Sequence, residues 1–266
     1  MMSIEHLIRQ LETQSTISIP AGWGQGRATF GGLLGSLMLS RLHAVLGDLT
    51  NDRVLRSATI SFIGAVAPGD VEIKTEIFRS GKSVTQASAT LLQDGAVMAL
   101  LLANFGSSRV SAIDIPATIS SPQGKSPEEA MKFAYILGVM PEFIQQVDLR
   151  WAQGALPFSG AKQADFSGWM RWKDTFPVMS VTHLLGLIDS WPPSVLPVLK
   201  GPGNASTLSW NIEFLSHDFN KSSEHWWQYQ VTTDFAHSGY AHAVAHIWDD
   251  EKNLVAISRQ VTTVFA

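Results

Sequence analysis

Apolar residues recur at helical spacing between Gly31 and Gly47, and this pattern predicts a helix there. Leu34, Met38, Leu42 and Val45 form one apolar stripe along it. Further leucines occupy its other sides, so we expect a helix that is buried almost all round.

Alternating apolar and polar residues follow this helix and predict antiparallel strands that are joined by tight turns. Alternation marks the segments SATISFI, VEIKTEIF and VTQASATLL. Asp94-Gly95 after the third segment is a hairpin signal. The next segment, AVMALLLANF, is apolar enough to predict a strand that is buried on both faces.

The same order of elements returns in the second half of the chain. An apolar helix, SVTHLLGLID, is ended by Pro192-Pro193, and four strands follow: TLSWNIEF, HWWQYQVTTDF, YAHAVAHIW and LVAISRQVTTVF. Between the halves, residues 107–125 are rich in Ser, Pro, Gly and Thr and resemble a linker. Ser126-Pro127-Glu128-Glu129 matches a capping box, which predicts a helix running to Gly138.

The two halves can be aligned with each other. SATIS at 57–61 matches ASTLS at 205–209, and Ala99 matches Ala256. Each half is then one buried helix followed by antiparallel strands, which is a hot-dog unit. We therefore predict an α+β double hot dog, with its two sheets joined edge to edge so that fewer strand edges stay bare. The expected divisions are an N-terminal unit at 1–110, a linker with one helix at 111–140 and a C-terminal unit at 141–266.

Composition removes several classes of function. The chain has 266 residues, a formal net charge of −4 and no run of Lys and Arg, which argues against nucleic acid and anionic membranes as partners. It has no cysteine, so disulfides, thiolate metal sites and a cysteine nucleophile are excluded. The N-terminus lacks the apolar region of a secretory signal, and we expect a soluble cytoplasmic protein.

Three polar residues stand out in the second half as candidates for chemistry. Asp189 follows an apolar helix at its C-terminal end, where the helix dipole disfavours a carboxylate, and this misfit favours a functional role. Thr207 lies early in a strand, and Gln260 interrupts the otherwise apolar last strand. A carboxylate, a hydroxyl and a carboxamide together can hold and deprotonate one water molecule.

The first half lacks this chemistry. In the repeat alignment, Met38, Thr59 and Ala103 occupy the three corresponding positions, and they cannot assemble a base. We therefore expect the site to belong to the C-terminal half. Gly31-Gly32, which open the first helix, are candidate substrate-binding residues, because a helix N-terminus offers backbone N–H groups to an oxyanion.

Taken together, these motifs resemble those of the acyl-CoA thioesterase II family. The resemblance is carried by the three candidate residues and by three segments of the first half: Phe30-Gly31-Gly32, Pro68-Gly69-Asp70 and Arg79-Ser80-Gly81-Lys82-Ser83. It implies hydrolysis of a fatty acyl-CoA to free acid and CoA through a water held by Asp189, Thr207 and Gln260. It also implies a homo-oligomer, a role in fatty acid metabolism, no cofactor, no metal and no covalent intermediate.

Two alternatives remain open. Asp218-Phe219-Asn220 followed by His225 is similar to the Asp and His signature of hot-dog hydratases that act on enoyl-CoA. A non-catalytic acyl-CoA-binding protein would keep the pocket without turnover.

Overall fold

The computed structural model describes residues 2–217, 219 and 221–265. Its first half contains the helices α1 (Ile4–Gln10) and α2 (Gly31–Leu46), the 3-10 helix η1 (Gly47–Thr50), and the strands β1 (Thr16–Ile19), β2 (Gly24–Gln25), β3 (Ala28–Thr29), β4 (Arg53–Phe62), β5 (Gly69–Ser80), β6 (Val84–Gln93) and β7 (Ala96–Ser107). Its second half contains α3 (Val181–Ile188), η2 (Glu142–Gln145), η3 (Leu196–Val198), β8 (Met131–Lys132), β9 (Val147–Gly154), β10 (Phe166–Trp172), β11 (Asn204–Phe214), β12 (Trp227–His237), β13 (Tyr240–Trp248) and β14 (Leu254–Phe265).

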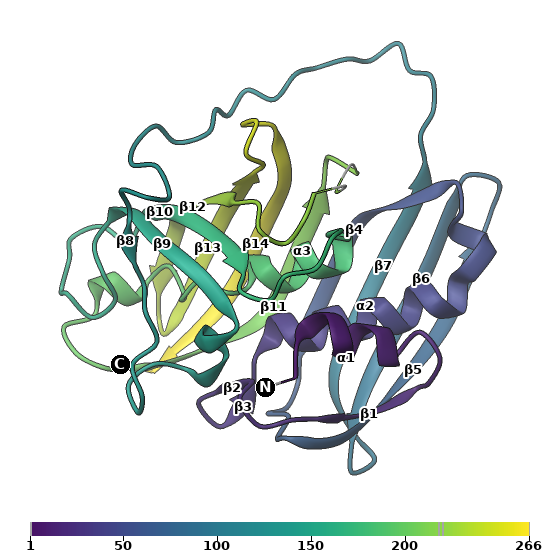
Figure 1. Cartoon of the computed structure of the whole chain (residues 1–266), viewed down its shortest axis with the longest axis horizontal. Coiled ribbons are helices and arrows are strands. Elements are labelled where there is room, and N and C mark those ends of the chain that lie inside the picture. Colours follow the sequence, from purple (N-terminus) through teal and green to yellow (C-terminus); the bar gives the residue numbers. More distant parts are fainter. Residues whose placement is uncertain (1, 218, 220, 266) are drawn as a thin grey trace.

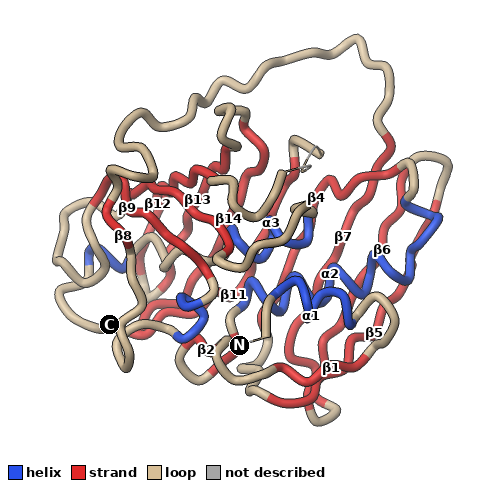
Figure 2. The backbone as a smooth tube through the Cα atoms, in the orientation of Figure 1, coloured by secondary structure: helices blue, strands red, loops and turns tan. Residues whose placement is uncertain are grey.

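One antiparallel sheet runs through both halves of the described chain. Its 12 strands follow the order β1-β5-β6-β7-β4-β11-β14-β13-β12-β10-β9-β8. Strands β4 to β7 pass behind α1 and α2, and a long loop connects β7 to β8 over one end of the molecule (Figures 1 and 2). The predicted double hot dog is therefore confirmed, including the continuous sheet.

The two halves meet where β4 pairs with β11. Ser61 lies opposite Ser209 in this pair, and Thr59 lies opposite Asn211. The Asn211 side-chain amide donates a hydrogen bond of 2.9 Å to the Thr59 hydroxyl across this junction. Each unit thus covers an edge that the other would leave unpaired.

Helices α2 and α3 pack against each other in opposite directions. The Ser36 hydroxyl donates to the carbonyl oxygen of Thr182 at 2.9 Å. A Cβ atom on Gly32 would lie only 2.4 Å from the carbonyl oxygen of Gly186, so glycine is required for this close approach. The packing brings the C-terminal end of α3 to the N-terminal end of α2. None of the helices in the described ranges has the length and apolar character needed to cross a membrane.

The predicted helix from Ser126 to Gly138 is wrong. The capping box itself forms: Ser126 N–H donates to the Glu129 carboxylate at 3.1 Å, and Glu129 N–H donates to the Ser126 hydroxyl at 3.4 Å. Only one turn follows, because Met131 and Lys132 then pair with β9 as strand β8. A cap alone does not sustain a helix when a neighbouring strand offers pairing to the backbone.

The expectation that AVMALLLANF is buried on both faces is also wrong. This segment is β7, and Leu101 and Ala103 are buried whereas Leu100 and Leu102 are 40% and 50% exposed. The reason is that the helices cover only one face of an antiparallel sheet, so alternate residues of a uniformly apolar strand face outward in this chain.

Strand registers revise one part of the repeat alignment. Equivalent pairs in the two units are Phe62 with Ala99, and Phe214 with Ala256. In this register Ala103 still corresponds to Gln260, as in the alignment of the two sequence halves. Thr59, however, corresponds to Asn211, and its alignment with Thr207 is wrong. The similarity of SATIS and ASTLS reflects shared small polar residues rather than equivalent positions.

Candidate active site

Asp189 links the two helices that meet at the centre of the molecule. It is the C-terminal cap residue of α3. Its carboxylate accepts a 2.8 Å hydrogen bond from the Gln260 side-chain amide and another from the backbone N–H of Gly32. The N-cap residue of α2, Phe30, supplies no side-chain cap. Asp189 therefore caps the N-terminus of α2, where the helix dipole favours a negative charge.

The surroundings of Asp189 shift the pKa of its carboxyl into the neutral pH range. Burial raises the pKa of its carboxyl to about 7 from an ordinary value of 3.8, although the hydrogen bonds from Gln260 and Gly32 pull in the opposite direction. The residue as a whole remains only partly buried. A carboxylate with a pKa near 7 can take up and release a proton at neutral pH, as a general base requires.

Gln260 is fixed in one orientation by its neighbours. It lies on the inner face of β14, which it shares with Ala256 and Ser258. Its amide nitrogen donates to Asp189, and its amide oxygen accepts a long hydrogen bond of 3.5 Å from the Thr207 hydroxyl. The three candidate residues, which come from α3, β11 and β14, therefore form one hydrogen-bonded chain.

A β-bulge directs Thr207 toward this chain. Thr207 lies opposite Thr262 and Ser209 lies opposite Val261, so Leu208 is the extra residue on β11. A regular strand would place Thr207 and Ser209 on the same face, but the bulge changes the alternation. Beyond it, Trp210 is fully buried on the helix-facing side. The residue pattern of β11 did not predict this bulge.

The two glycines at the start of α2 have different roles in the structure. The Gly32 N–H donates to Asp189 and is already engaged. The Gly31 N–H makes no hydrogen bond with any described residue. A Cβ on Gly31 would lie 2.8 Å from the second Asp189 carboxylate oxygen and 3.1 Å from the Phe62 ring, so the site has no room for a side chain there.

Aromatic side chains form a wall beside Asp189. Trp191 stacks on Tyr229, with ring centroids 5.2 Å apart and ring planes 11° apart. The Trp191 indole N–H donates to the Met170 sulfur at 3.3 Å, and a Cβ on Gly168 would lie 2.4 Å from the ring. These contacts hold the Trp191 ring in place. Sequence reasoning missed Tyr229, whose one signal was a tyrosine among the apolar positions of a predicted strand.

Of the residues that favoured a hydratase, His225 is described and does not contact the candidate site. Asp218 and Asn220 lie outside the described residues. His225 lies beside the Ser222 hydroxyl at 3.2 Å and the Asp250 carboxylate at 3.9 Å. Among the described residues, no group of three or more His, Asp and Glu side chains is placed to hold a metal ion.

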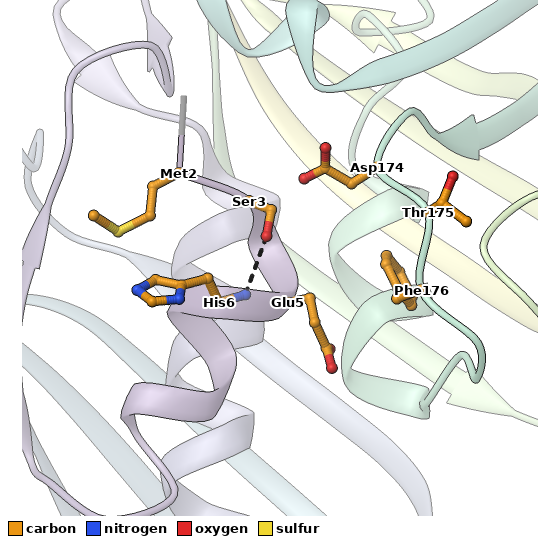
Figure 3. A pocket seen from close by; sticks show the side chains of 7 residues that line it. All are labelled: Met2, Ser3, Glu5, His6, Asp174, Thr175 and Phe176. Carbon is orange, nitrogen blue, oxygen red and sulfur yellow. Dashed lines mark hydrogen bonds between the residues drawn. The ribbon is translucent and has the colours of Figure 1, made fainter.

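A surface hollow of about 500 Å³ lies between α1 and the segment before α3 (Figure 3). Glu5 and Asp174 line it, and the Ser3 hydroxyl caps α1 by accepting the backbone N–H of His6 at 3.2 Å. None of the candidate site residues lines this hollow. None of the candidate site residues lines the second, smaller hollow around Trp226 either.

Comparison with known proteins identifies the family. Residues 19–106 match the model of the acyl-CoA thioesterase N-terminal domain, and residues 117–264 match that of the acyl-CoA thioesterase C-terminal domain. No curated protein matches this sequence significantly.

Several solved structures share the fold. A hot-dog protein of unknown function from Alicyclobacillus acidocaldarius has a TM-score of 0.84 and 20% identity over 98% of both chains. The tesB protein of Mycobacterium avium subspecies paratuberculosis has a TM-score of 0.77 and 14% identity over 99% of this chain and 100% of its own. Acyl-CoA thioesterase II TesB2 from Mycobacterium marinum has a TM-score of 0.71 and 16% identity over 97% and 98%. Because the two domain models together match most of its length, this chain belongs to the acyl-CoA thioesterase family.

Proposed function

We propose that this protein hydrolyses fatty acyl-CoA thioesters to the free acid and CoA, and that Asp189, Gln260 and Thr207 carry the reaction. The observation behind the proposal is the Asp189 carboxylate, which has a pKa of about 7 and is held by Gln260 and Gly32. Membership of the thioesterase family supports the reaction class.

The chemistry follows from the protonation of Asp189. The ionised carboxylate takes a proton from a water molecule while the water oxygen attacks the thioester carbonyl carbon. The tetrahedral intermediate then collapses and the carbon–sulfur bond breaks. The proton held by Asp189 passes to the departing sulfur, which leaves as the CoA thiol. The base thereby returns to its ionised state without a covalent intermediate.

The other two residues orient this base and its water. Gln260 can donate from its nitrogen and accept at its oxygen simultaneously, so it fixes the direction of the Asp189 carboxylate. Thr207 fixes Gln260 in turn through its hydroxyl. The Gly31 N–H is free to donate to the carbonyl oxygen as negative charge develops on it.

Asp189→Asn should lower kcat at least about a hundredfold, since a general base typically contributes that much. The measurement is release of CoA from acyl-CoA substrates, followed with a thiol reagent. Asp174→Asn, which changes an exposed carboxylate, is the matched control and should keep full activity. Near-normal hydrolysis by the Asp189 variant would remove this residue from the mechanism.

The same assay separates the alternative functions. Wild-type protein that binds acyl-CoA without releasing CoA would be a binding protein. Hydration of enoyl-CoA in a parallel assay would indicate a hydratase.

Titration of the Asp189 carboxyl should control both the activity and the stability of the protein. Because the base must be ionised, kcat/KM should rise by about tenfold per pH unit below pH 7 and level off above it. The folded-state pKa of Asp189 is raised from 3.8 to about 7, so the folded protein binds more protons than the unfolded chain between these values. Stability from this group is therefore present below pH 4 and is lost as pH rises to 7.

As the pH rises through this range, the free energy of unfolding should fall by on the order of 3–4 kcal/mol. Asp189→Asn should abolish it, so urea denaturation should show the variant gaining on the wild type from pH 4 to pH 8. An equal difference between the two proteins at both pH values would show that Asp189 does not titrate in this window.

Gln260→Ala should lower kcat while KM stays nearly constant, with a loss of roughly 1–3 kcal/mol of transition-state stabilisation. Loss of the amide donor should also raise the pKa of Asp189 further, so the rise of kcat/KM with pH should move to higher pH. Gln86→Ala, at an exposed position on β6, is the control. An increase in KM with unchanged kcat would make Gln260 a substrate-binding residue instead.

A further inference from the structure

Tyr229 is a buried tyrosine whose ring is held rigidly beside the candidate site. It lies on β12 and is 7% exposed. Its ring stacks on Trp191, which follows Asp189 by two residues, and lies 6.3 Å from the Phe166 ring. Both stacking partners are themselves packed, since their centroids lie 5.7 Å apart. The phenol therefore has little freedom to turn.

The hydroxyl of this ring has no partner within the described residues. Tyrosine hydroxyls that are buried usually find one. The Ser190 hydroxyl and the Trp227 indole N–H, which are also unpaired, are sealed from solvent. The Tyr229 oxygen is not among these sealed and unpaired atoms, and the residue as a whole keeps an exposed fraction of 7%. A rigid ring thus carries a hydrogen-bond donor that no described residue uses.

This donor lies within the electrostatic reach of Asp189. Burial raises the pKa of Tyr229 well above its ordinary value, and the Asp189 charge is the second, smaller cause. The phenol consequently stays protonated at any pH at which the enzyme would work. It is a fixed, neutral O–H donor in the neighbourhood of the base.

The candidate site is short of such a donor. Stabilisation of an oxyanion usually draws on preorganised hydrogen-bond donors, often more than one. The sequence pointed to the N–H groups of Gly31 and Gly32, but the Gly32 N–H donates to Asp189. Only the Gly31 N–H remains unengaged at the start of α2.

We propose that the Tyr229 hydroxyl contacts the substrate and donates a hydrogen bond to the thioester carbonyl oxygen, where it supplements the Gly31 N–H. This inference rests on the proposed thioesterase function. It assigns a further catalytic residue from β12, a strand that holds none of the three residues discussed above. The stack on Trp191 preorganises the hydroxyl, so little entropy is lost when the hydrogen bond forms.

Tyr229→Phe tests this directly, because it removes one oxygen and keeps the stacked ring. We expect kcat to fall about a hundredfold to a thousandfold, as for the loss of one oxyanion donor, with little change in KM and in the urea midpoint. Tyr240→Phe, at a position 46% exposed, is the matched control and should have wild-type kinetics. Unchanged kcat in the Tyr229 variant would overturn the proposal and leave the tyrosine as wall packing.

A measurement without turnover distinguishes this failure from failure of the proposed function. The probe is a dethia acyl-CoA, a ketone in which CH₂ replaces the thioester sulfur. In a crystal structure of its complex, the Tyr229 oxygen should lie within hydrogen-bond distance of the ketone oxygen. Calorimetry should show weaker binding to Tyr229→Phe than to the wild type.

A ketone oxygen that binds away from Tyr229 in a wild-type enzyme that hydrolyses acyl-CoA would refute the tyrosine assignment alone. Absence of both hydrolysis and analogue binding would refute the proposed function and the tyrosine assignment together.

Discussion

The structure of the candidate site depends on one interaction, the contact of the Asp189 carboxylate with the N-terminus of α2. At the C-terminus of its own helix this carboxylate opposes the dipole, but the antiparallel packing of α2 and α3 places it against the favourable end of a longer helix. Gly32 and Gly186 make that packing close enough. The hydrogen bonds from Gln260 and Gly32 offset only part of the desolvation, which leaves the pKa near neutrality.

The continuous sheet positions the partners of this carboxylate. β14, which carries Gln260, is held between β11 and β13 along its length, so a residue near the end of the sequence is as well fixed as the core. The N-terminal unit has Ala103 at the corresponding position. That unit supplies instead the start of α2 and the β4 edge that β11 covers. A single set of candidate residues therefore lies where the two units meet.

Sequence patterns predicted the elements that are governed by local periodicity and turn chemistry. The apolar helix that begins at Gly31 and the Asp94-Gly95 hairpin follow from residue spacing alone, and Asp94 and Gly95 both adopt the left-handed conformation that such a turn requires. Asp189 was identifiable because it violates a local preference. Such violations are expected where function overrides stability.

What could not be predicted depends on contacts between distant segments. The capping box at Ser126 was real, but pairing of Met131 with β9 ended the helix after one turn. The bulge at Leu208 is a property of the β11–β14 ladder and leaves no mark in β11 alone. The engagement of Gly32 and the placement of the Tyr229 ring likewise depend on how α2, α3 and β12 pack together.

We propose that Asp189 acts as a base on water rather than as a nucleophile on the thioester. Single-turnover hydrolysis in H₂¹⁸O, with enzyme in excess over acyl-CoA, distinguishes these two roles of Asp189. Mass spectrometry of the product acid and of the peptide that contains Asp189 would follow the label. Direct attack by water places one ¹⁸O in the acid and none in Asp189. Appearance of ¹⁸O in the Asp189 carboxylate, with unlabelled acid, would reveal an acyl-enzyme anhydride and exclude Asp189 as a base on water.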